Sequence, residues 1–396
     1  MLTFSSIQEA FENIKDHIHK TPVIYSNSFS KMADAEVYLK AENLQKTGSF
    51  KVRGAFNKMT NIKGKVIAAS MGNHAQAVAF AAGKIGIQAK IVMPMTAPIV
   101  KEEATKGYGA EVILYGETFK EALNYALSQK DYTFIHAFDD EEVIAGQGTI
   151  GIEIMDDLKD ADIVLVPVGG GGLVAGIATS VKAISPKTKI IGIQTESATS
   201  AFDSFKDKNI REKTPSPTIA DGIAIGRIGN RTFEIINRYA DDMILVNENS
   251  IAKAILLFLE RKKLVVEGAG AVPLAALLEN KEKFARKKIV LVVSGGNIDF
   301  TLIDRIIYKG LVTSGRIGVF EVTVDDIPGS LHFLTGTIAS HRANILDVIH
   351  NRLSEDIPIG KTKVVFVIET RNREHFERIL SDVKKKGFAA AAKSEG

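Results

Sequence analysis

Residues 161–173 have the sequence ADIVLVPVGGGGL. A continuous apolar run bounded by glycine is typical of a strand that is buried on both faces of a parallel sheet. Four glycines follow this strand, and a helical pattern then extends from Leu173 to Ile184. A strand, a glycine-rich turn and a helix in this order predict one unit of an alternating α/β fold.

The same alternation continues on both sides of this stretch, from about residue 36 to residue 310. We expect strands at 35–40, 65–70, 89–94, 110–116, 161–168, 189–196, 242–247 and 287–296. We expect helices at 49–61, 73–85, 96–106, 118–128, 148–158, 173–184, 250–262 and 270–278. The alternation therefore predicts a largely parallel sheet flanked by helices.

The pattern changes after about Gly315. Strand patterns at 316–326, 344–352 and 361–370 alternate with helical patterns at 330–342 and 372–386. This β-α-β-β-α order predicts a separate α+β module over residues 316–396. The last residues, FAAAAKSEG, stand where a fourth strand belongs, although alanine, lysine and glutamate are poor strand formers.

The composition excludes several classes of function. The chain has 396 residues, of which 45% are hydrophobic and 24% charged, as in an ordinary globular protein. Its basic residues are scattered and its net charge is only +3, so we expect no nucleic-acid partner. The absence of cysteine excludes disulfides, thiolate metal sites and a cysteine nucleophile. Its apolar runs are too short to span a bilayer, and residues 1–20 resemble neither a signal nor a transit peptide, so we expect a cytoplasmic enzyme.

Lys51 is the first candidate for chemistry. It lies in the sequence SFKVRG, residues 49–54, at the expected start of a helix and between two apolar residues. Both the helix dipole and burial lower the pKa of such a lysine. A neutral amine is what Schiff-base formation requires. An exposed first-turn lysine is the alternative, and for an isolated lysine it is the better interpretation.

The four glycines at 169–172 favour an anion site. Glycine allows successive backbone amides to converge on a phosphate, and the following helix start adds its field. A purely structural turn needs one or two glycines, so four make that interpretation weak. A rival interpretation is a dinucleotide fingerprint, with Gly170-x-Gly172-x-x-Ala175 and Glu196 as the ribose-binding acid.

Three further features are weak when taken singly. Residues 70–76, SMGNHAQ, follow an expected strand and begin an expected helix. The free backbone amides at the start of that helix suit a carboxylate. The alternatives are that Asn73 only caps the helix and that His74 is a packed core side chain. Residues 294–297, SGGN, end a strand at the sheet edge where ligands bind. Glu267 is a carboxylate among apolar neighbours, either functional or an acid at a helix start.

Together these motifs resemble the threonine dehydratase (threonine ammonia-lyase) family of fold-type II pyridoxal-phosphate enzymes. The likeness runs from residue 4 to about 315, with the motifs in the family's order and spacing. It implies two parallel-sheet α/β subdomains within residues 1–315, the smaller one inserted at about 50–145. It implies that Lys51 forms the Schiff base with pyridoxal 5'-phosphate, that Asn73 bonds the pyridine hydroxyl, and that Ser294 partners the ring nitrogen. It also implies that Phe50 packs near the cofactor, that the phosphate is held by Gly169, Gly170, Gly171, Gly172 and Leu173, and that the substrate carboxylate is held by Ser70, Gly72, Asn73 and His74.

The resemblance implies a reaction as well. L-threonine would be converted to 2-oxobutanoate and ammonia, with L-serine giving pyruvate as a side or co-substrate. Related serine racemases have a serine where this chain has Met71, which cannot transfer protons, so racemisation is disfavoured. Relatives with a divalent cation have an aspartate six residues after the position of Glu196, which this chain lacks, so we expect no metal.

Residues 324–331, VDDIPGSL, resemble the strand-to-helix turn of an ACT domain. This implies allosteric control by an amino acid, for example feedback in isoleucine biosynthesis. ACT modules commonly pair side by side, so we expect a homo-oligomer, a dimer or tetramer. A module that only dimerises the enzyme is the alternative.

Other functions compete with ammonia-lyase activity. A β-replacement enzyme of the cysteine synthase type would share the fold, but the ACT-like module and the SFKVRG form of the lysine motif argue against it. A non-catalytic amino-acid sensor is the alternative from another class, and the intact Lys51, Asn73 and Ser294 argue against it. A nicotinamide-dependent oxidoreductase rests on the Gly170–Ala175 match alone.

Overall fold

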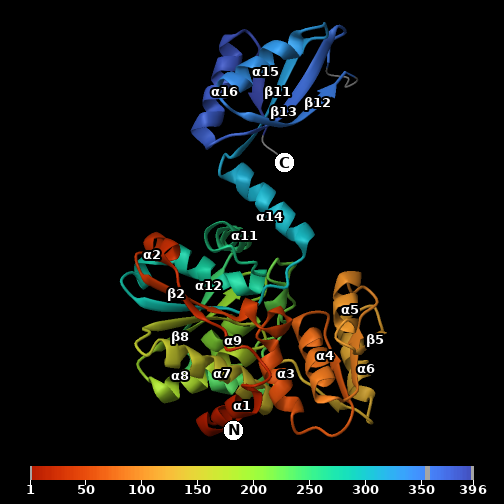
Figure 1. Ribbon diagram of the computed structural model, residues 1–396, viewed down its shortest axis with the longest axis vertical. Coiled ribbons are helices and arrows are strands. Elements are labelled where there is room, and N and C mark those ends of the chain that lie inside the picture. Colours follow the sequence, from red (N-terminus) through yellow and green to blue (C-terminus); the bar gives the residue numbers. More distant parts are fainter. Residues whose placement is uncertain (1, 353–356, 394–396) are drawn as a thin grey trace. The chain divides into compact units, whose positions relative to one another are not determined.

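A six-stranded sheet forms the centre of residues 1–298 (Figure 1). The computed structural model describes residues 2–352 and 357–393. The strand order is β1-β2-β10-β7-β8-β9, in which β1 is antiparallel to β2 and the other pairs are parallel. The strands are β1 (Val23–Tyr25), β2 (Glu36–Ala41), β7 (Ile163–Pro167), β8 (Lys189–Thr195), β9 (Asp242–Val246) and β10 (Lys288–Val293). All of β7 is buried, which explains its unbroken apolar sequence.

Helices cover both faces of this sheet (Figure 1). Helix α12 (Gly268–Glu279) crosses one face, in contact with β7 to β10. Helices α7 (Glu141–Asp157) and α8 (Gly172–Ile184) pack together on the other. Around them lie α1 (Phe4–Ile14), α2 (Asn27–Ala33), α9 (Ser200–Asp207), α10 (Asn230–Tyr239), α11 (Glu248–Leu257) with a π-helical turn at Phe258–Lys262, and α13 (Lys281–Phe284).

A second, smaller sheet is inserted between β2 and β7. Its order is β5-β4-β3-β6 and every pair is parallel. The strands are β3 (Val66–Ala69), β4 (Ala89–Met93), β5 (Glu111–Leu114) and β6 (Thr133–Phe134), and the helices are α3 (Lys51–Met59), α4 (Asn73–Ile85), α5 (Ile99–Lys106) and α6 (Phe119–Ser128). Alternate strand residues enter two apolar clusters, one with α3 and α4 and the other with α6. The two largely parallel sheets confirm the predicted α/β class.

The second unit, Asp299–Gly396, is an antiparallel α+β module. It contains α14 (Phe300–Thr313), β11 (Ile317–Asp325), α15 (Ser330–Ser340), β12 (Asn344–Asn351), β13 (Lys361–Glu369), α16 (Arg373–Lys385) and β14 (Ala389–Ala392). The sheet order is β12-β13-β11-β14, consistent with the predicted ACT-like fold. The poor strand sequence at the end does form a strand, because Ala389 to Ala392 pair with Thr323 to Phe320 of β11.

Internal contacts separate the two units between residues 298 and 299, whereas the sequence pattern changes between residues 315 and 316. The difference corresponds to helix α14, for which no helix was expected from the sequence. None of the helices in the described ranges has the length and apolar composition that crossing a bilayer requires.

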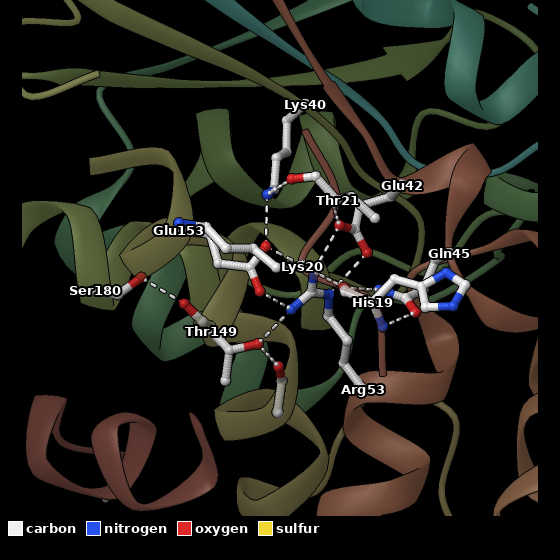
Figure 2. A network of polar contacts seen from close by, with 12 residues as sticks. His19, Lys20, Thr21, Lys40, Glu42, Gln45, Arg53, Thr149, Glu153 and Ser180 are labelled. Carbon is white, nitrogen blue, oxygen red and sulfur yellow. Dashed lines mark hydrogen bonds and ion pairs between the residues drawn. The ribbon is translucent and has the colours of Figure 1, made fainter. Parts of the chain in front are cut away.

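A buried ionic network fixes α3 to the larger sheet and its helices (Figure 2). The guanidinium of Arg53 has no exposed surface. Its Nε and Nη2 donate to the two carboxylate oxygens of Glu42 at 2.8 Å each, and its Nη1 and Nη2 donate to Glu153 at 2.7 and 2.9 Å. Nη1 also donates to Thr149 Oγ1 at 3.1 Å. Two bidentate pairs of this kind fix both the position and the plane of the guanidinium.

Lys40 completes the network and balances its charge. Its Nζ donates to Glu153 Oε2 at 2.5 Å and to the Thr21 carbonyl at 2.6 Å. Two cations thus face two carboxylates. Burial disfavours the charged form of Glu42, but the Arg53 guanidinium outweighs burial and holds the pKa of this carboxyl below its usual value. The network joins β2, α7 and the turn Glu42–Leu44 to α3, the helix that begins at Lys51.

We predict that Arg53→Met lowers the free energy of unfolding by about 3–5 kcal/mol, because it leaves buried carboxylates without their partner. Urea unfolding followed by circular dichroism measures this. The control is Lys20→Met, which removes an ion pair to Asp157 in which the two side chains are 56% and 31% exposed. Exposed pairs contribute only about 0–1 kcal/mol. Equal losses in both variants would contradict the prediction.

Candidate active site

Lys51 lies at the start of α3, as the sequence predicts, and is half-buried. Its Nζ donates to the Ala137 carbonyl at 3.0 Å and stands 5.2 Å from the centre of the Phe50 ring. Burial lowers the pKa of this amine to about 8, while the charge of Glu267 acts in the opposite direction. A larger fraction of the amine is therefore neutral near pH 7 than for an ordinary lysine, as a nucleophile or base requires.

The glycine loop joins β7 to α8. Gly171 has a φ of +94°, in the left-handed region that favours glycine, and no side chain caps the helix that follows. A Cβ on Gly170 would lie 2.3 Å from the Phe138 ring, and Thr232 Oγ1 donates to the Gly170 carbonyl at 2.7 Å. The loop is thus held closely from both sides, and its glycines and uncapped helix start suit a phosphate.

Residues 70–74 form a second helix start. Gly72 precedes α4, and no side chain caps the start of that helix. The Gly72 amide donates to Ser70 Oγ at 3.2 Å. The His74 ring is buried, and its Nε2 bonds the Ile135 carbonyl at 2.9 Å. Burial and the nearby Lys51 lower the pKa of His74 to about 3, so its imidazole is neutral. His74 is therefore a core side chain, and its backbone amide is the part that suits a substrate carboxylate.

Asn73 joins the second helix start to the SGGN turn. Its Nδ2 donates to both carboxylate oxygens of Glu267, at 2.9 and 3.0 Å, and its Oδ1 accepts from Asn297 Nδ2 at 2.8 Å. Asn297 Nδ2 also donates to the Thr47 carbonyl at 2.7 Å. These contacts orient the Asn73 side chain, with its Nδ2 toward Glu267 and its Oδ1 toward Asn297.

The SGGN turn also lies against the lysine motif. The Phe50 amide donates to the Ser294 carbonyl at 3.1 Å, and Ser49 forms a β-bridge with Gly295. Ser294 itself is only 2% exposed. The structure therefore brings together candidate residues of all four sequence motifs: Phe50, Lys51, Ser70, Gly72, Asn73, Gly169, Gly170, Gly171, Gly172, Leu173 and Ser294.

Residues 135–139, which no motif in the sequence marks, connect these parts. Ile135 accepts from His74, Ala137 accepts from Lys51, and Phe138 packs on Gly170. Asp139 accepts from the first amides of α10 at 2.9 to 3.2 Å. This segment directly follows a strand of a parallel sheet, a position where site residues are expected.

No group of three or more metal-ligating side chains occurs among the described residues. The donors that converge are instead an amine, backbone amides at two helix starts, an amide side chain and a hydroxyl. This set fits a cofactor with an aldehyde, a phosphate and a polar ring. Phe138 packs this closely against the glycine loop only because Gly170 has no Cβ.

The chain is similar to known proteins along its whole length. A family model described as "Pyridoxal-phosphate dependent enzyme" matches residues 14–295. The L-threonine ammonia-lyase of Thermotoga maritima is 48% identical over 396 residues, and that of Geobacter sulfurreducens is 45% identical over 397 residues; each comparison covers 98% of both chains. The solved structure of a processed threonine deaminase from Solanum lycopersicum matches with a TM-score of 0.74 and 39% identity, covering 77% of this chain and 92% of that one.

We predict that Gly170→Ala weakens pyridoxal-phosphate binding. The added Cβ would meet the Phe138 ring and displace the loop. Loss of one charge-assisted hydrogen bond, about 1.5–3 kcal/mol, corresponds to about tenfold or more in the dissociation constant. Absorbance titration of the cofactor-free chain measures this. In the control Gly64→Ala the new Cβ meets nothing within 4 Å, so affinity stays unchanged. Wild-type affinity in Gly170→Ala would argue against this loop as the phosphate site.

Proposed function

The chain belongs to the family of pyridoxal-phosphate dependent enzymes, and on this premise we propose that it converts L-threonine to 2-oxobutanoate and ammonia. The observation that carries the proposal is the convergence of Lys51, the glycine loop, Asn73 and Ser294 in one site. Relatives that bear the name L-threonine ammonia-lyase align with both units of this chain, the C-terminal module included.

Bound pyridoxal phosphate supplies an aldehyde for Schiff-base formation and a ring that withdraws electrons from the substrate Cα. In this proposal Lys51 holds the aldehyde carbon and the amides of Gly169 to Leu173 hold the phosphate at the start of α8. Asn73 bonds the ring hydroxyl and Ser294 bonds the ring nitrogen, while Phe50 packs beside them. A serine hydroxyl does not force protonation of that nitrogen, and elimination of a β-hydroxyl does not need the stronger electron withdrawal.

Lys51 Nζ is the proposed base that removes the proton from the threonine Cα. The substrate carboxylate lies at the start of α4, where Ser70, Gly72 and the amides of Asn73 and His74 receive it. Racemisation requires a second acid or base that returns a proton to the substrate Cα from the face opposite Lys51. Met71 occupies the sequence position at which related racemases have this group. It has no group that can transfer one, which favours elimination over racemisation. L-serine, which has the same β-hydroxyl, is the expected side substrate.

We also propose that residues 1–315 carry catalysis and that residues 316–396 serve regulation by an amino-acid effector. The β-α-β-β-α-β order and the turn at Asp325–Ser330 support an ACT-like module. We further propose a homo-oligomeric, cytoplasmic enzyme, with the modules as the pairing elements.

The first test is an absorbance spectrum of the purified protein before and after addition of L-threonine, with 2-oxobutanoate assayed in the same cuvette. We expect a yellow protein whose band shifts as the oxo acid accumulates. A yellow protein that forms no oxo acid from threonine or serine would indicate β-replacement chemistry. A protein that stays colourless with added pyridoxal phosphate would favour the amino-acid sensor.

We predict that Lys51→Ala loses its colour on dialysis and loses turnover by about 10²–10⁴-fold or more, because removal of a positioned base has that effect. Ammonia release from threonine and the visible spectrum are measured together. The control is Lys63→Ala, which removes an exposed lysine and should behave like the wild type. Retained colour and ammonia release in Lys51→Ala would disprove the assignment.

A further inference from the structure

Glu267 is a buried carboxylate that the roles above leave unused. It precedes α12 at the cap position, yet its side chain accepts no hydrogen bond from that helix. Both of its carboxylate oxygens instead accept from Asn73 Nδ2, across a sequence separation of 194 residues. Its side chain therefore does not serve as the helix-start acid that the sequence left as an alternative.

The backbone around Glu267 is shaped to receive this carboxylate. A Cβ on Gly295 would lie 2.5 Å from Glu267 Oε1, and one on Gly222 would lie 3.6 Å from the same atom. The Glu267 amide donates to the Gly295 carbonyl at 3.1 Å. The carboxylate thus occupies a space that Gly295 leaves open between Asn73 and the SGGN turn, the two places proposed to contact the cofactor ring.

Four groups decide the charge of Glu267. The pKa of Glu267 is raised to about 7 in all, and burial is the largest cause. The hydrogen bond from Asn73 lowers the pKa, Asp221 raises it, and Lys101 and Lys51 lower it. Lys101 and Asp221 form an ion pair of 2.9 Å, so their effects largely cancel. Lys51 is the remaining cation, and its own amine is in turn stabilised in the charged form by Glu267.

We infer that Glu267 is the second titratable group of this active site, a positioning residue that orients Asn73 and acts as the charge partner of Lys51. The inference rests on the proposed function. When Lys51 Nζ accepts the substrate proton it becomes a cation inside the protein, and an ionised carboxylate nearby stabilises that cation. A proton on Glu267 removes this stabilisation, so turnover should fall as pH decreases through the value at which Glu267 protonates.

The direct test is infrared difference spectroscopy of the full-length chain without cofactor. We expect the carbonyl stretch of a protonated carboxyl to disappear as pH rises through about 7. The band should be absent in Glu267→Gln. The matched control, Asp221→Asn, removes an equal charge but keeps the band and moves its midpoint to lower pH. A wild-type protein with no carboxyl titrating near neutrality would overturn the inference.

A second variant covers the case in which Glu267→Gln does not fold. Asn73→Ala keeps the carboxyl and removes the hydrogen bond that lowers its pKa, so the infrared midpoint should move to higher pH. An unmoved midpoint would show that Asn73 and Glu267 do not interact and would overturn the inference.

Two functional measurements separate an active-site role from a structural one. In Glu267→Gln, Lys51 loses a stabilising charge and its pKa falls, so the pH profile for Schiff-base formation with added pyridoxal phosphate should move to lower pH. With threonine, kcat should fall several-fold and lose its acidic limb near pH 7, while KM changes little. An unchanged kcat and pH profile would overturn the role in turnover. If wild-type protein forms no oxo acid but shows the infrared band and the shifted Schiff-base profile, the proposed function fails and the pairing with Lys51 stands.

Discussion

Burying the guanidinium of Arg53 imposes the constraint on which the site depends. An unpaired buried charge is strongly destabilising, so the chain must place two carboxylates around it, and it takes them from the turn after β2 and from α7. Arg53 is two residues from Lys51 on the same helix. The geometry that satisfies the guanidinium therefore also sets the direction of α3 and the place at which Lys51 enters the site.

The sequence identifies elements well where local chemistry marks their ends. Helix α4 begins at Asn73 and α8 begins within the glycine run, because glycine after a buried strand marks such boundaries. Prediction from the sequence fails where these local signals are weak, or where the contact joins residues far apart in the chain. Helix α7 starts seven residues earlier than expected, although Asp140 caps it. The bond between Asn73 and Glu267 spans 194 residues, and no local pattern encodes such a contact.

The glycine loop also shows why a motif alone does not identify a ligand. A dinucleotide site and a pyridoxal-phosphate site both present backbone amides and a helix start to a phosphate, so Gly170-x-Gly172-x-x-Ala175 satisfies either. The difference lies in what else reaches the loop. Here Phe138, which packs on Gly170, belongs to the same short segment whose Ala137 carbonyl accepts from Lys51. A phosphate site beside an amine of lowered pKa suits an aldehyde cofactor. Glu196, the acid that a dinucleotide site would need, is an exposed side chain.

Desolvation acts on both titratable groups of this site, and its two effects are coupled. It is the largest cause of the shifts that bring the pKa of Lys51 down to about 8 and that of Glu267 up to about 7, because burial disfavours charge of either sign. An interior dry enough to give a neutral amine would by itself also protonate the carboxyl. The hydrogen bond from Asn73 and the charge of Lys51 oppose that protonation. The site thus gains a base that is easily deprotonated and keeps, just above neutral pH, the anion that the protonated base requires.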